Sequence, residues 1–123
     1  MIVASFLIKD MHLPYKLGEA WFKDTLVDYD EASNIFGWQW SSGGGADSQP
    51  YYRIFNPESQ AVSYAPDALY IKKWIPELRN ANPKDISRST NLELYDYPKA
   101  ILHHGTERLK ALEFLERFKK KLR

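Results

Sequence analysis

The chain has 123 residues, which favours a single domain, and its formal net charge of +1 leaves any nucleic-acid footprint to a local cluster of basic residues. The absence of cysteine excludes disulfides, thiolate metal sites and a cysteine nucleophile. The three histidines, His12, His103 and His104, are too few and too separated to form a convincing metal site, so we expect no bound metal.

The N-terminus is apolar but is not a targeting segment. It lacks the basic region of a signal peptide, and Lys9 and Asp10 follow the apolar residues at once. No apolar run reaches the roughly 18 residues that a bilayer-spanning helix needs. We therefore expect a soluble cytoplasmic protein with no membrane partner.

Two helices are predicted in the first part of the chain. Residues 2–11 form an apolar stretch that is typical of a short, buried helix, with Pro14 ending it. No capping residue precedes this stretch, so it looks like the continuation of an earlier element. Residues 18–27 predict a second helix whose inward side chains are Trp21, Phe22, Leu26 and Val27.

A third helix is predicted to begin after Asp28 and to run to about Trp40. Asp28 is the expected N-cap, because Glu31 follows it at the spacing of a capping box. The alternative for this acid is a role in a binding site. Trp40 is rotated about half a turn from Trp38, so we expect it to address a different surface.

One face of this third helix carries an unusual set of polar and aromatic groups. Asp30, Asn34 and Trp38 lie at i, i+4 and i+8 and therefore share one side of the helix. Together they offer an acceptor, an amide that can donate and accept, and an indole. Such a stripe suits a large, flat, heteroaromatic ligand with polar edges.

The rest of the chain predicts short helices, long loops and almost no strand. The expected helices are 57–63, 65–74 and a last one capped by Thr106, and the irregular segments are 41–50 and 80–94. Residues 51–55 are rich in aromatic side chains and compatible with an extended conformation. We therefore assign the chain to the all-α class.

The aromatic residues allow two interpretations. Trp38 and Trp40 could pack in the core, as most tryptophans do, and the stretch 51–53 could anchor a loop. Alternatively, Trp40 with Arg53 and the tyrosines could form a stacking surface for bases, with the arginine available for phosphate.

Several motifs closely resemble the photolyase/cryptochrome family, most of all the cyclobutane pyrimidine dimer photolyases. The residues that carry the resemblance are Met1–Leu7, Lys9-Asp10, Leu26–Asp30, Ala32-Ser33-Asn34, Gly37-Trp38-Gln39-Trp40, Tyr52–Pro57, Tyr70–Leu78 and Tyr97-Pro98. The resemblance covers nearly the whole chain. It implies that residues 1–123 are the C-terminal part of a helical FAD-binding domain, with the upstream half and the antenna domain lying outside the chain.

The resemblance implies a role for each residue of the polar stripe. Asp28 and Asp30 would meet the polar edge of the flavin, and Asn34 would face its N5 atom. Trp38 would be the tryptophan nearest the flavin in the electron-transfer chain that photoreduces FAD. The sequence departs from the family at Tyr15, which stands where photolyases usually have the middle tryptophan of that chain.

The resemblance also implies a surface for damaged DNA. Trp40 would stack on the flipped-out dimer, Met1 would touch the lesion, and Arg53 would lie at the lesion-bearing strand.

The function implied is light-driven electron transfer from reduced FAD to a pyrimidine dimer, whose cyclobutane ring then opens. With much of the pocket upstream, we expect the chain alone to bind FAD weakly or not at all and not to repair DNA. We also expect exposed apolar surface on the helix at 2–11, available to an upstream photolyase half or to self-association. The alternatives are a cryptochrome-type blue-light photoreceptor and a non-catalytic helical module that has lost the cofactor.

Overall fold

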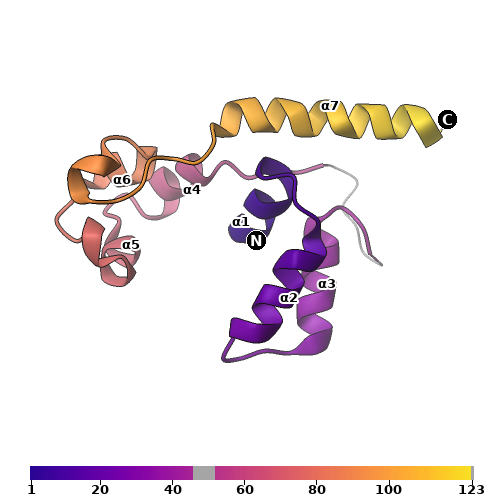
Figure 1. The fold of residues 1–123 in the computed structure, drawn as a ribbon, viewed down its shortest axis with the longest axis horizontal. Helices are drawn as coiled ribbons and strands as arrows, with labels where there is room; N and C mark the ends of the chain where they lie inside the picture. The colour runs from indigo at the N-terminus through magenta and orange to yellow at the C-terminus, as the bar shows by residue number, and fades with distance from the viewer. Residues whose placement is uncertain (46–51, 123) are drawn as a thin grey trace. The chain divides into compact units, whose positions relative to one another are not determined.

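The computed structural model describes residues 1–45 and 52–122. Within these ranges the secondary structure is helical and no strand is present, which confirms the all-α class (Figure 1). The chain divides into two compact units, one of Met1–Phe55 with Leu102–Arg123 and one of Asn56–Ile101. No helix among the described residues is both long enough and apolar enough to cross a membrane.

Five helical elements are present among the described residues of the first unit. They are α1 (Ile2–Ser5), the π-helical turn η1 (Phe6–Asp10), α2 (Tyr15–Thr25), α3 (Glu31–Ser41) and α7 (His104–Leu122). The pair α2 and α3 pack side by side (Figure 1). At their contact the ring of Trp38 lies directly over Gly18, and the rings of Phe22 and Trp38 meet in a T-shaped arrangement with a centroid distance of 5.0 Å.

The helix predicted at 2–11 forms as α1 followed by η1, but it is buried only in part. Ile2 and Val3 are exposed, which confirms the expectation of exposed apolar surface on this helix. Its buried residues are Ala4 and three polar ones, Ser5, Lys9 and Asp10. The polar residues are buried because neighbouring segments supply their hydrogen-bond partners.

Helix α7 is attached to η1 by two histidine–carboxylate pairs. The Nδ1 atom of His104 lies 2.6 Å from Oδ1 of Asp10, whose side chain is fully buried. The Nε2 atom of His12 lies 2.8 Å from Oε2 of Glu107. Because all four groups lie in η1, the turn after it and the first turn of α7, they hold the start of α7 in place.

The predicted cap of the last helix is wrong by about one turn. The helix begins at His104 rather than after Thr106. The backbone N–H of Thr106 donates to Nδ1 of His103, so the imidazole takes the capping role that we assigned to threonine.

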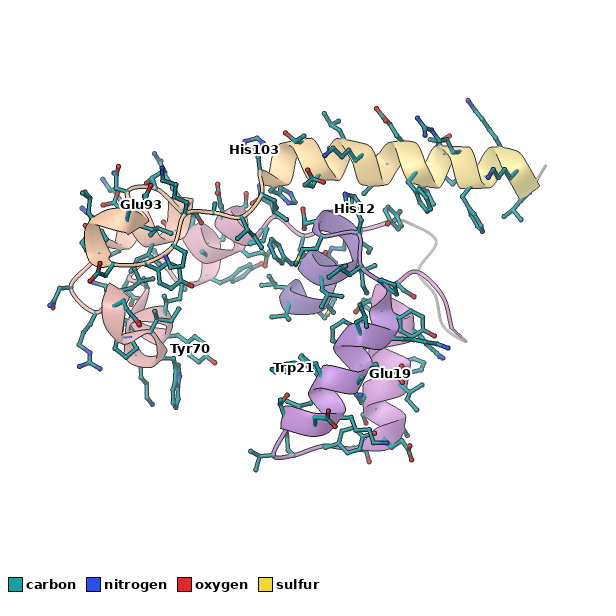
Figure 2. The ribbon with its side chains drawn as sticks, in the orientation of Figure 1. His12, Glu19, Trp21, Tyr70, Glu93 and His103 are labelled. Atoms are coloured by element: carbon teal, nitrogen blue, oxygen red, sulfur yellow. The ribbon has the colours of Figure 1, made fainter. Side chains whose placement is uncertain are left out.

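The inward face predicted for the second helix is also wrong in part. Phe22 is half-buried against Trp38, but Trp21 is 68% exposed and projects from the side of α2 away from α3 (Figure 2). Leu26 and Val27 are exposed as well, because the helix ends at Thr25 and both residues belong to the link that follows.

The second unit contains α4 (Pro57–Tyr64), α5 (Leu69–Trp74), η2 (Pro76–Leu78), α6 (Pro83–Arg88) and η3 (Leu92–Tyr95). Its core is small and consists of Ala68, Leu78, Ala81, Ile86 and Leu92.

The segment 80–94, which we expected to be irregular, contains α6 and most of η3. The N-terminal signal that we overlooked is Asn82-Pro83: the Asn82 side chain accepts from the Lys84 N–H, and proline occupies the first turn. Asp85 then accepts hydrogen bonds from Thr90, Asn91 and Tyr95, which fixes the turn after α6.

The contact between Trp38 and Gly18 leads to a prediction with an internal control. A Cβ atom at Gly18 would lie 2.1 Å from the Trp38 ring, whereas a Cβ at Gly37 would meet nothing within 4 Å. We expect Gly18→Ala to lower the free energy of unfolding by about 1–3 kcal/mol through overpacking. Gly37→Ala should raise it by about 0.5–1 kcal/mol, because glycine is disfavoured inside a helix. Urea unfolding followed by tryptophan fluorescence measures both, and equal effects would contradict the packing described here.

The two histidine pairs lead to a second prediction. His104→Ala removes the hydrogen-bond partner of a fully buried carboxyl group, so we expect a loss of about 3–5 kcal/mol in unfolding free energy. His12→Ala should cost far less, because the His12 side chain is 39% exposed and Lys110 also pairs with Glu107. Thermal and urea unfolding compare the two variants. A His12→Ala loss as large as that of His104→Ala would argue against the buried pair as the main attachment of α7.

Candidate functional site

The residues that we predicted to bind or react with a flavin line one cavity in the first unit. Its volume is about 670 Å³, which is typical of small-molecule sites. Asp28, Asp30, Asn34 and Trp38 all border it. The helical period therefore predicted correctly that the stripe on α3 faces a common space.

Asp30 is the N-cap of α3, which corrects the prediction that Asp28 caps this helix. Its carboxylate accepts a hydrogen bond of 2.8 Å from the backbone N–H of Ser33. This bond lowers the pKa of Asp30 below its ordinary value of 3.8, so the group stays ionised and remains an acceptor at the cavity wall. Asp28 lies before the cap, exposed in the link from α2, and also borders the cavity.

Asn34 is held in one orientation by the neighbouring helix. The residue is 8% exposed, and its Nδ2 atom donates to the backbone carbonyl of Glu19 on α2 at 3.0 Å (Figure 2 labels Glu19). Because the amide nitrogen is fixed in this way, the amide plane cannot turn freely at the cavity wall.

Trp38 forms the inner end of the stripe and is 3% exposed. Within the described part of the chain, the ring stacked edge-on against it is Phe22, and Tyr15 is not among its aromatic partners. Both interpretations of Trp38 therefore hold at once, since the indole is part of the α2–α3 core and also lines the cavity.

A second, smaller cavity brings together the three residues that we predicted at the DNA lesion. Met1, Trp40 and Arg53 line this space of about 160 Å³. Met1 and Trp40 also border the larger cavity, so the two spaces share a wall. We had expected Trp40 to be separate from the face of the α3 stripe, and the structure places it at the border of both.

Lys9 is the residue of this region that the sequence analysis missed. It is 6% exposed on η1, lines the smaller cavity, and donates from Nζ to the backbone carbonyl of Arg53. Burial lowers the pKa of Lys9 and raises that of Tyr52, whose ring lies 4.6 Å from the Lys9 Nζ. The spacing of four residues between Ser5 and Lys9 places both on one side of a helix, but it does not indicate what either residue contacts.

The larger cavity fits a flavin in the kinds of groups that it presents. An ionised carboxylate and a fixed amide can meet the polar edge of an isoalloxazine ring, which carries both N–H donors and carbonyl acceptors. A buried indole beside them offers an apolar and polarizable wall. No cluster of metal-ligating side chains occurs among the described residues.

Comparison with known proteins also points to a flavin-binding domain. The family model described as the FAD binding domain of DNA photolyase matches residues 1–117. The chain is 44% identical to the deoxyribodipyrimidine photo-lyase of Agrobacterium fabrum over 91% of this chain and 26% of that protein. It is 48% identical to that of a Synechococcus species over 85% of this chain and 22% of the relative.

The fold is also similar to that of solved photolyase and cryptochrome structures. An archaeal photolyase from Sulfolobus tokodaii with two FAD molecules superposes with a TM-score of 0.80 at 32% identity, over 94% of this chain and 26% of that chain. A cryptochrome from Synechocystis superposes with a TM-score of 0.78 at 30% identity, over 90% and 25% of the respective chains. The chain thus spans about a quarter of the length of these relatives.

The cap at Asp30 predicts a specific dependence on pH. Because its pKa is lowered in the folded state, Asp30 stabilises the chain above its ordinary pKa of 3.8, and this contribution is lost as pH falls below that value. Asp30→Asn keeps a capping side chain that does not ionise, so its unfolding midpoint in urea should fall less than that of the wild type between pH 6 and pH 3. An identical acid response in both proteins would contradict the cap.

Proposed function

The chain belongs to the family of FAD-binding domains of DNA photolyases, and from this membership we propose that it supplies part of the site for light-driven repair of pyrimidine dimers. FAD is the cofactor of the family. The chain would correspond to the C-terminal part of the FAD-binding domain. Other residues beyond those of this chain would complete the pocket and the enzyme.

The observation that carries the proposal is the wall shared by the two cavities. The larger one presents the residues suited to a flavin edge, and the smaller one presents a cation and aromatic rings. Met1 and Trp40 border both spaces. A cofactor in one cavity and a base in the other would therefore be close neighbours, as electron transfer between them requires.

Each residue of the larger cavity has a defined part in this proposal. Reduced FAD, when bound and excited by light, supplies the electron that opens the cyclobutane ring. Asp28 and Asp30 accept hydrogen bonds from the polar edge of the flavin, and Asn34 is held by Glu19 where it faces N5. Trp38 is the tryptophan nearest the flavin and would supply the electron when FAD is photoreduced.

The smaller cavity takes the lesion in the same proposal. Trp40 provides a face on which a flipped-out pyrimidine dimer stacks, and Met1 closes the side toward the flavin. Arg53 is exposed, and its guanidinium lies 4.5 Å from the centre of the Phe55 ring, which leaves the cation free to pair with a phosphate of the damaged strand.

A cryptochrome-type photoreceptor is the second candidate, because a cryptochrome shares this fold at 30% identity. The flavin side of the proposal is the same for both functions. The Trp40–Arg53 side favours repair, since stacking and phosphate contacts are needed only where DNA binds. Light-dependent loss of dimers separates the two.

Trp38 lines the larger cavity and not the smaller one, whereas Trp40 also lines the smaller one, so we expect substitutions of the two tryptophans to have different effects. We would place Trp40→Ala and Trp38→Phe in a chimera in which this chain replaces the matching segment of the Agrobacterium fabrum photolyase. Trp40→Ala should weaken binding of dimer-containing DNA about tenfold or more, because stacking on one aromatic contributes roughly 1–3 kcal/mol. It should retain most of the flavin, because Asp30, Asn34 and Trp38 still line the larger cavity. Trp38→Phe should retain lesion binding and slow photoreduction of FAD.

Binding titrations, flavin absorbance and photoreduction rates measure these outcomes. If Trp40→Ala instead removes the flavin or unfolds the chimera, while DNA affinity per folded molecule is unchanged, then Trp40 is a core residue and the DNA-facing role of this cavity is wrong.

A further inference from the structure

Among the described residues, Lys9 is buried without the carboxylate partner that usually accompanies a buried lysine. Its side chain lies on η1 and the residue is 6% exposed. Among the described residues no carboxylate lies within 4.0 Å of its Nζ atom, and the adjacent Asp10 is engaged by His104. Burying an ammonium group without a counter-charge is unfavourable, so the folding of η1 alone does not explain this residue.

The groups that Lys9 does contact belong to one short segment, residues 52–55. Its Nζ donates to the backbone carbonyl of Arg53 and lies 4.6 Å from the centre of the Tyr52 ring. One turn earlier on the same helix, the Ser5 hydroxyl accepts a hydrogen bond of 3.1 Å from the backbone N–H of Phe55. The helix therefore holds the segment at both ends.

The side chains of this segment form much of the smaller cavity. Tyr52, Arg53 and Phe55 line it, and the Arg53 guanidinium rests over the Phe55 ring at 4.5 Å. Arg53 has no helical neighbours to fix its backbone, because residues 52–55 lie outside any helix. The hydrogen bond from Lys9 therefore fixes the position of the Arg53 backbone. The backbone position in turn limits which part of the surface the Arg53 guanidinium can occupy.

We propose that Lys9 is a positioning residue for the binding of a nucleic-acid phosphate, acting through Arg53 by fixing the backbone of residues 52–55. This inference rests on the proposed function, because it assumes that Arg53 meets DNA. It adds that the cation in contact with phosphate is Arg53, while Lys9 holds the Arg53 carbonyl. If Lys9 met phosphate itself, the two cations would contribute independently.

Double-mutant analysis of single-stranded DNA binding separates these cases. The probe is a fluorescent oligothymidylate of about ten nucleotides, which needs neither FAD nor a lesion, and binding to the 123-residue chain is measured by anisotropy at several salt concentrations. The variants are Lys9→Met, which keeps the unbranched apolar stem and removes the ammonium group, Arg53→Ala, and the two combined. Lys119→Met is the matched control, because Lys119 lines the same cavity from α7 and makes no described hydrogen bond to residues 52–55.

We expect Lys9→Met to weaken binding nearly as much as Arg53→Ala, and the double variant to be no weaker than Arg53→Ala alone. Each single variant should lower the slope of log affinity against log salt by about 0.7, the value for one phosphate contact on a single strand. The effect of Lys119→Met should instead add to that of Arg53→Ala. Circular dichroism verifies folding. If Lys9→Met does not fold, Ser5→Ala, which releases the Phe55 end of the segment, should show the same coupling to Arg53→Ala.

Two results overturn the inference alone: Lys9→Met with normal affinity while Arg53→Ala binds weakly, or losses that add in the double variant. A wild-type chain that does not bind the oligonucleotide, or that binds it equally well after Arg53→Ala, overturns the DNA surface of the proposed function and the inference with it.

Discussion

The burial of polar groups on one short helix is the constraint on which the first unit depends. Ser5, Lys9 and Asp10 face inward from α1 and η1, and each must be hydrogen-bonded to be tolerated there. The partners come from distant parts of the chain, namely Phe55, Arg53 and His104. Apolar packing alone would allow these segments to shift along the helix, whereas hydrogen bonds require particular donors and acceptors at short distances. They therefore fix the segment 52–55 and the start of α7 to the same helix.

This arrangement has a direct consequence for the candidate site. Met1, the residue before this helix, borders both cavities, and residues that the helix fixes line the smaller one. The larger cavity depends on a different contact, the packing of Trp38 onto Gly18 and Phe22 between α2 and α3. Trp40, two residues after Trp38 on α3, lines both the larger and the smaller cavity and so connects them. The chemistry that we propose requires both contacts, because one positions the flavin side and the other the DNA side.

Much of the flavin side could be predicted because it follows from the helical period. Asp30, Asn34 and Trp38 had to share a face once α3 was recognised, whatever packs against that face. The cap was harder, since Asp28 and Asp30 are both good capping residues and only the backbone decides where the helix begins. The buried role of Lys9 could not be predicted, because its partner is a backbone carbonyl 44 residues away, and carbonyls leave no mark in the sequence. Trp21 was misassigned because helical spacing does not show whether a second partner covers that face.

We propose that these 123 residues can serve as the matching quarter of a photolyase. The most direct test is dimer repair by the chimera in which this chain replaces the matching segment of the Agrobacterium fabrum enzyme. Purified chimera should contain about one FAD per chain, and blue light should remove cyclobutane dimers from irradiated oligothymidylate, with no loss in the dark. A folded chimera that binds FAD and damaged DNA but leaves the dimers intact under light would contradict the claim.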